Sequence, residues 1–130
     1  MQSLASPFDP YFPKPGEPAL HWSGLYGSAE GLTIAQTATQ DNPPVIVVTR
    51  DNRRLQLLHN EIQFYRSGRN VPPLVRLPDW ECLPYDIFSP HQDITSERLR
   101  TLAQVPTMCH GLLLVTLETL MQRLPPTTHI

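Results

Sequence analysis

The sequence predicts an α/β domain built on a parallel sheet. Three short apolar runs, at 44–49, 74–77 and 111–116, alternate with segments whose apolar residues recur at helical spacing. The first and third runs lack polar alternation, which is typical of parallel strands buried on both faces. The order helix, strand, helix, strand, helix, strand, helix then predicts a doubly wound sheet with right-handed crossovers.

The composition excludes several classes of protein. The chain has 130 residues, of which 40% are hydrophobic, so we expect one globular domain rather than a disordered chain. No apolar run approaches the roughly 18 residues of a membrane span, and the N-terminus lacks the basic and apolar regions of a secretory signal. We therefore expect a cytoplasmic protein with no membrane partner. The net charge of -2 argues against tight binding of duplex DNA at physiological salt.

The metal-ligand residues are scattered. The two cysteines, Cys82 and Cys109, have no CxxC spacing and no histidine at zinc-site spacing. None of the five histidines forms an i, i+4 pair. The sequence predicts no metal site and favours two reduced thiols over a disulfide.

Proline content divides the chain into two parts. Residues 1–19 contain five prolines, which fix φ and remove donors, so they predict an extended lead-in. Residues 20–130 form the predicted α/β domain. Its first helix is expected in the region 28–41, with one side formed by Leu32, Ala35 and Ala38.

The next elements have clear boundaries. After the strand at 44–49, Asp51 can cap a helix over 52–66. A turn at 67–73 leads into the strand at 74–77. The apolar side of that helix consists of residues at helical spacing: Leu55, Leu58, Ile62 and Tyr65.

A long Pro-rich loop at 78–93 precedes the third helix, which we expect at 95–105. Asp93 or Thr95 can cap this helix, and Leu99 and Leu102 should point inward. After the strand at 111–116, Thr116 can cap a last helix that Pro125 ends. In open α/β sheets, ligands bind beyond the carboxyl ends of the strands. The long loop is therefore where we expect any site.

The stretch "LYGSAEGLTIA" resembles a phosphate-binding loop with essential parts missing. Glu30 stands at the position of the phosphate-binding lysine, and Gly31 stands at that of the magnesium-binding hydroxyl. A carboxylate near a triphosphate is repulsive by roughly 1–4 kcal/mol. Gly27, Glu30 and Gly31 therefore predict a degenerate loop that binds neither ATP nor magnesium, or an ordinary glycine-rich entry to a helix.

The long loop admits three interpretations. Cys82 or Asp86 could act with His91 in catalysis, but no third residue is placed to orient such a pair. The loop could instead be a rigid structural element, with its aromatic side chains packed on the sheet edge. It could also be a docking surface. We predict no catalytic residue.

The words "DWE.LPYD.FSPHQDI.S.RL.TL" and "PTM..G.L.V...TLMQR" resemble the N-terminal region of the bacterial transcription-repair coupling factor family (Mfd). The likeness covers about residues 44–126, is weaker from about 20, and leaves the Pro-rich lead-in unmatched. The family-signature residues of the loop form a possible interaction surface: Trp80, Leu83, Pro84, Tyr85, Asp86, Ser89, Pro90, His91, Gln92, Asp93 and Arg98.

The resemblance implies that this chain is the first subdomain of a much longer bacterial protein. That protein would be an ATP-dependent DNA translocase that displaces stalled RNA polymerase and recruits UvrA in nucleotide excision repair. Its motor, with ATP and magnesium, would lie in later domains, as would the contacts with RNA polymerase and DNA. UvrA would be bound by the subdomain that adjoins this one.

The resemblance also implies a helicase-like (RecA-like) fold similar to UvrB, with a phosphate loop that the family has lost. The aromatic DNA-clamping hairpin of UvrB has no room between His91 and the helix near Thr95. The implied role is a non-catalytic scaffold that supports UvrA recruitment and interdomain autoinhibition through contacts with other domains of the same protein. Two alternatives remain: a stand-alone nucleotide-binding domain and a module that binds UvrA directly.

Overall fold

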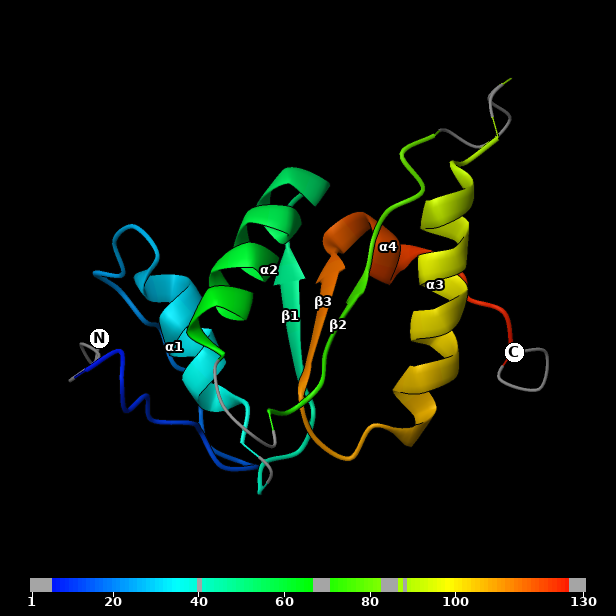
Figure 1. Cartoon of the computed structure of the whole chain (residues 1–130). Helices are drawn as coiled ribbons and strands as arrows, with labels where there is room; N and C mark the ends of the chain where they lie inside the picture. The colour runs from blue at the N-terminus through cyan, green and yellow to red at the C-terminus, as the bar shows by residue number, and fades with distance from the viewer. Residues whose placement is uncertain (1–5, 40, 67–70, 83–86, 88, 127–130) are drawn as a thin grey trace.

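The computed structural model describes residues 6–39, 41–66, 71–82, 87 and 89–126 (Figure 1). Within these residues, four α-helices and three strands alternate, and a short 3-10 helix, η1, precedes the last strand. In chain order the elements are α1 (Ala29–Thr37), β1 (Val45–Thr49), α2 (Asn52–Tyr65), β2 (Leu74–Leu77), α3 (Gln92–Gln104), η1 (Val105–Thr107), β3 (Leu112–Thr116) and α4 (Leu117–Met121).

The three strands form one parallel sheet in the order β1-β3-β2. β1 aligns with β3 from the pair Val45 and Leu112 to the pair Thr49 and Thr116. β2 lies on the other side of β3, with Leu74 also opposite Leu112. The predicted small α/β domain with a parallel sheet is therefore confirmed, and the strand that comes last in the chain lies in the centre.

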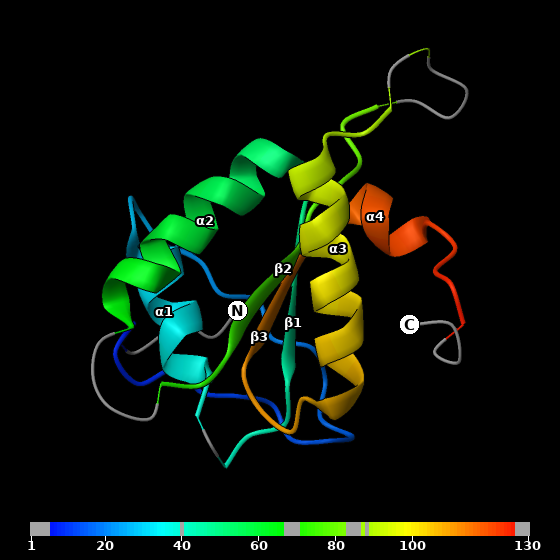
Figure 2. The ribbon, with the colours of Figure 1, turned by 45° about the vertical axis from the view of Figure 1, so that its right-hand side comes forward.

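Helices lie on both sides of the sheet. α2 packs on β1 and β3, while α3 runs along β2 on the opposite side (Figures 1 and 2). α1 packs on α2. α4 follows β3 directly and contacts β3 and β1 at the carboxyl ends of the strands.

The core lies between α2 and the sheet. The buried side of α2 carries the predicted Leu55, Leu58 and Ile62, which pack on Leu112 and Leu114 of β3. Partly buried residues of α1 and its C-cap, of β1 and of β2 pack around this cluster: Ile34, Ala35, Ala38, Val45, Val47 and Leu74.

Two predicted helix caps are present. The side chain of Asp51 accepts a hydrogen bond of 2.7 Å from the backbone N–H of Arg54 at the start of α2. Thr116 accepts one of 3.2 Å from the N–H of Thr119 at the start of α4. Such caps satisfy backbone donors that have no partner within the helix.

The prediction for α3 was wrong in two respects. The helix begins at Gln92 with His91 at its cap, so Gln92 and Asp93 belong to the first turn rather than to the loop. Leu99 is 54% exposed, whereas Arg98 and Thr101 are buried. The cause is that α3 meets β2 through polar contacts, including a hydrogen bond of 2.7 Å from the hydroxyl of Thr101 to the carbonyl of Arg76.

Two further expectations fail. β1 is not buried on both faces, because Ile46 is 57% and Val48 is 47% exposed, and no described element covers them. The last helix ends at Met121, before the predicted stop at Pro125, because Gln122 has an extended backbone conformation.

Candidate functional site

Arg98 fixes the first part of the long loop to α3 and to the end of α4. The Arg98 guanidinium stacks on the Trp80 ring at 4.2 Å from the centroid and donates to the carbonyl of Pro78. It also donates to the Gln122 side chain at 3.3 Å, and the Gln122 amide donates to Asp79 at 3.0 Å. This network joins α3 to the loop and to the end of α4.

The same loop is tied to the start of α2 through Asn52. The Asn52 side chain accepts from the backbone N–H of Asp79 at 3.1 Å and donates to the Glu81 carboxylate at 3.2 Å. Glu81 has a φ of 59°, in the left-handed region that non-glycine residues rarely adopt. Contacts at both ends of this short segment therefore hold an unfavourable backbone conformation in place.

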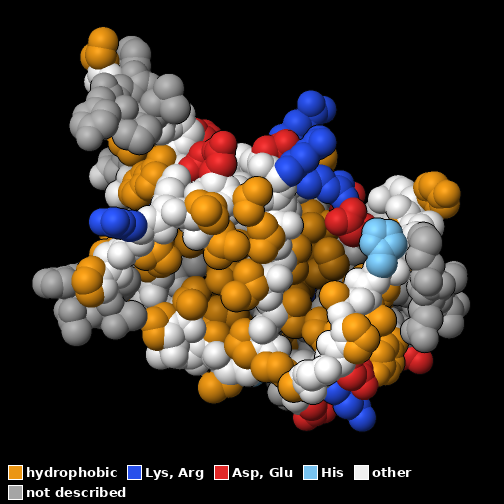
Figure 3. All heavy atoms as spheres, turned by 180° about the vertical axis from the view of Figure 1, so that it is seen from behind, with side chains coloured by type: hydrophobic (Ala, Val, Ile, Leu, Met, Phe, Trp, Pro, Cys, Tyr) orange, Lys and Arg blue, Asp and Glu red, His pale blue; other side chains and the backbone are white. Residues whose placement is uncertain are grey.

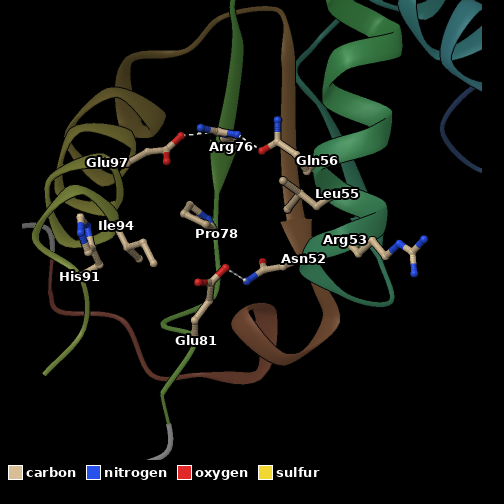
Figure 4. Close-up of a pocket in the computed structure, with 10 residues that line it drawn as sticks. All are labelled: Asn52, Arg53, Leu55, Gln56, Arg76, Pro78, Glu81, His91, Ile94 and Glu97. Atoms are coloured by element: carbon tan, nitrogen blue, oxygen red, sulfur yellow. Dashed lines mark hydrogen bonds and ion pairs between the residues drawn. The ribbon is translucent and has the colours of Figure 1, made fainter. Parts of the chain in front are cut away.

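A cleft of about 660 Å³ opens between α2 and α3 beyond the carboxyl end of β2 (Figure 4). Leu55, Pro78 and Ile94 form its apolar part. The remaining lining is polar or charged and comprises Asn52, Arg53, Gln56, Arg76, Glu81, His91 and Glu97.

Arg76 lies between two side chains in this cleft. Its guanidinium pairs with Glu97 of α3 and donates to the amide oxygen of Gln56 of α2 (Figure 4). The charges lining the cleft balance, since Arg53 and Arg76 are matched by Glu81 and Glu97. A balanced cleft of this kind does not favour a polyanionic ligand.

His91 caps a helix in this structure. Its Nδ1 accepts from the backbone N–H of Asp93 at 3.3 Å and lies 3.4 Å from the Asp93 carboxylate. Within the part of the chain that the structure describes, no hydrogen bond joins Cys82 to His91. Asp86, the other candidate partner of His91, lies outside the described residues.

The loop at the start of α1 has the three residues that we predicted to mark a degenerate phosphate loop. Gly27 has a φ of 58°. Glu30 forms an ion pair with Arg54 of α2. At Gly31 an added Cβ would lie 2.5 Å from the Cβ of Glu61, so this glycine permits the close approach of α1 to α2.

Burial shifts the pKa of three cationic side chains. Burial lowers the pKa of Arg98, and the negative charge of Asp79 partly opposes this. Burial also lowers the pKa of Arg66. For His59, burial is again the main cause of a lowered pKa, and the positive charge of Arg76 adds to it. These shifts belong to groups in or next to packed interfaces, and none lies on a titratable pair arranged for catalysis.

The predicted surface is brought together only in part. Trp80 and Arg98 are in contact, and Gln92 and Asp93 are exposed at the start of α3 beside Ser89. Pro90 is half-buried. Four of the predicted residues lie outside the described part of the chain: Leu83, Pro84, Tyr85 and Asp86.

Sequence reasoning missed Asn52, Arg76 and Gln122. Arg76 carried a signal, since it is the one charged residue in the run "LVRL" and must have a partner where that strand meets two helices. Asn52 and Gln122 carried none, because their partners are distant in sequence.

Among the residues that the structure describes, no group of three His, Cys, Asp or Glu side chains could hold a metal ion. Both cysteines are free thiols, as the sequence favoured. A search of the same residues finds no helix with the length and apolar character needed to cross a membrane.

No protein-family model matches the chain. Among curated proteins, it is 44% identical over 102 residues, or 78% of its length, to the transcription-repair-coupling factor of Escherichia coli (strain K12). It is 39% identical over 105 residues to the protein of that name in Haemophilus influenzae, and 33% identical over 82 residues to that of Myxococcus xanthus. The chain is homologous to part of the transcription-repair-coupling factor.

This homology confirms the resemblance carried by the loop sequence. The matched segments are 8% and 9% of the Escherichia coli and Haemophilus influenzae coupling factors. The chain thus spans less than a tenth of the length of these relatives.

Proposed function

We propose that the chain is a non-catalytic scaffold subdomain of a transcription-repair coupling factor, within a helicase-like module that resembles UvrB. It supports the adjoining subdomain that binds UvrA, and it contributes contacts between domains that keep the resting protein inhibited. ATP hydrolysis with magnesium, RNA polymerase binding and DNA translocation belong to other domains of this longer, cytoplasmic protein. The observation that carries the proposal is the 44% identity over 102 residues, which make up only 8% of the Escherichia coli coupling factor.

The loop before α1 supports a non-catalytic role. A working phosphate loop follows a strand and places a lysine against the phosphates. Here described residues 20–26 form no strand, and the lysine position holds Glu30, which pairs with Arg54. An incoming phosphate would meet a carboxylate and would compete with it for the arginine.

The network around Trp80 supports a structural role for the loop after β2. Arg98, Asn52 and Gln122 each form a hydrogen bond to this loop: Arg98 donates to Pro78, Asn52 accepts from Asp79, and Gln122 donates to the Asp79 carboxylate. A loop held in this way has a fixed position relative to α2, α3 and α4, so it can serve as a rigid contact for a neighbouring domain.

Calorimetric titration of the wild-type chain with magnesium-ATP tests whether the chain binds nucleotide. We expect no binding at micromolar ATP. Micromolar affinity that disappears in a Gly27→Val variant would show instead that the chain is a nucleotide-binding domain.

UvrA capture tests the second part. We expect the 130-residue chain alone to leave UvrA unbound, whereas the chain extended by the adjoining subdomain should retain it. Removal of residues 20–126 from the full-length protein should reduce UvrA capture and leave its ATPase active. Capture by the 130-residue chain alone would assign UvrA binding directly to this domain.

A further inference from the structure

The sheet face opposite α2 is open over β1. Val45 and Val47 of β1 pack toward the core under α2. Ile46 and Val48 alternate with them, face the other way, and are 57% and 47% exposed. β1 pairs only with β3 among the described residues, so one edge of its backbone also has no strand beside it.

α4 enlarges this apolar surface. It contacts β1, and three of its residues at helical spacing, Leu117, Leu120 and Met121, are 54%, 51% and 79% exposed. Figure 3 shows hydrophobic side chains gathered across the middle of the face seen from behind, with charged side chains mainly near its border. We call Ile46, Val48, Leu117, Leu120 and Met121 the β1 surface.

We infer that the β1 surface binds a strand and a helix from another part of the same, longer polypeptide. The strand would pair with the free edge of β1, and the helix would cover Ile46 and Val48. Parallel sheets are covered on both faces in α/β proteins. An exposed, apolar edge strand is a site for pairing with a further strand.

A segment of the same polypeptide fits this surface better than other partners do. The five residues of the β1 surface are apolar, whereas a nucleic-acid backbone is bound through Lys and Arg side chains. Pro43 and Pro44 precede β1 and have no N–H, so a strand that pairs with this edge can extend along little more than Val45–Thr49. The inference rests on the proposed function, because the relatives supply about nine-tenths of their length beyond the matched segment, and a tethered partner acts at millimolar effective concentration.

Thiol labelling tests the inference. Ile46→Cys is introduced into the 130-residue chain and into the full-length product of its gene, and maleimide modification is followed by peptide mass spectrometry. Leu57→Cys is the matched control, because Leu57 lies on α2 and is 48% exposed. We expect similar labelling rates for the two thiols in the short chain, and at least a tenfold lower rate for Ile46→Cys relative to Leu57→Cys in the full-length protein. Val48→Cys repeats the measurement should Ile46→Cys fail to fold.

Equal relative rates in the two proteins would overturn the inference, as would a gene product that ends at Ile130. Protection in the short chain that rises with its concentration, together with a dimer in sedimentation, would assign the surface to a second copy instead. The two tests are independent. Protection of Ile46→Cys without the expected UvrA capture would contradict the proposed function alone, and UvrA capture without protection of Ile46→Cys would contradict this inference alone.

Discussion

The guanidinium of Arg98 lies over the indole ring of Trp80, with its central carbon 4.2 Å from the ring centroid. Arg98 is 3% exposed and also donates to Pro78 and Gln122. A cation that stacks on an aromatic ring and is largely removed from water gains more from the contact than an exposed one. This one side chain of α3 therefore holds the loop after β2 and the end of α4.

Replacing Arg98 should destabilise the fold strongly. We expect Arg98→Ala to lower the free energy of unfolding by about 3 kcal/mol, because it removes the stacking contact and leaves the partly buried Pro78 carbonyl without its donor. Arg98→Lys should recover less than half of this, since an ammonium lacks the planar fork of the guanidinium. Urea unfolding measures both. Arg100→Ala, at an exposed position of the same helix, is the control, with an expected change below about 0.5 kcal/mol. Equal effects at Arg98 and Arg100 would contradict the role of the network.

Gly31→Ala should destabilise the domain, although alanine is the better helix former. The new Cβ would lie 2.5 Å from the Cβ of Glu61, so α1 must move away from α2. We expect a loss of about 1–3 kcal/mol in the free energy of unfolding. The same substitution in a Glu61→Gly background should cost clearly less, because the obstructing Cβ is gone. Equal costs in both backgrounds would show that the helix contact is not the cause.

Glu30→Lys restores the lysine of a phosphate loop and should still give no ATP binding. Gly31 remains where a hydroxyl would hold magnesium, and the new lysine faces Arg54 in place of an ion pair. The side chains of Glu30 and Arg54 are 42% and 30% exposed, so loss of this ion pair should lower the free energy of unfolding by only about 0.5 kcal/mol. The swap Glu30→Arg with Arg54→Glu should restore stability. Calorimetry with magnesium-ATP checks the binding, and micromolar affinity in Glu30→Lys would contradict the prediction.

Acidification should destabilise the domain through His59. Burial and the positive charge of Arg76 lower the pKa of His59 in the folded state, and its Nδ1 is buried without a partner, while Glu97 and Asn60 act in the opposite direction. The unfolded chain therefore binds the proton more readily. Stability attributable to His59 is intact above the unfolded pKa of about 6.5 and falls as the pH drops below it.

Urea unfolding between pH 7.5 and 5.5 measures this effect. We expect His59→Gln to flatten the fall in stability over this range. Gly31→Ala is the control, since it should lower stability at every pH without changing the slope. An unchanged slope in His59→Gln would contradict the prediction.

The fold could be predicted because the strands and α2 carry strong local signals. The run "VIVVT" and the spacing of Leu55, Leu58 and Ile62 specify their elements without help from distant residues. The cap at Asp51 could be read for the same reason.

The polar side of α3 could not be predicted. Apolar spacing placed Leu99 inside, but Arg98 and Thr101 occupy that side because they find partners on the backbone of β2 and the loop after it. The partner of Thr101 is 25 residues away in the sequence, and the partner of Arg98 is 20 residues away. The sequence placed any site at the loop after β2, where the cleft opens, but it could not give the lining, which comes from two helices and a loop whose proximity the sequence does not state.

The strand order has a consequence for synthesis on the ribosome. β1 and β2 pair with β3 and not with each other, and β3 is the last of the three to be made. The nascent chain therefore holds two unpaired apolar strands until Leu112–Thr116 has emerged, and the whole sheet then forms at once from contacts that are distant in sequence. Such late, long-range closure slows folding and leaves the growing chain exposed to association with its neighbours.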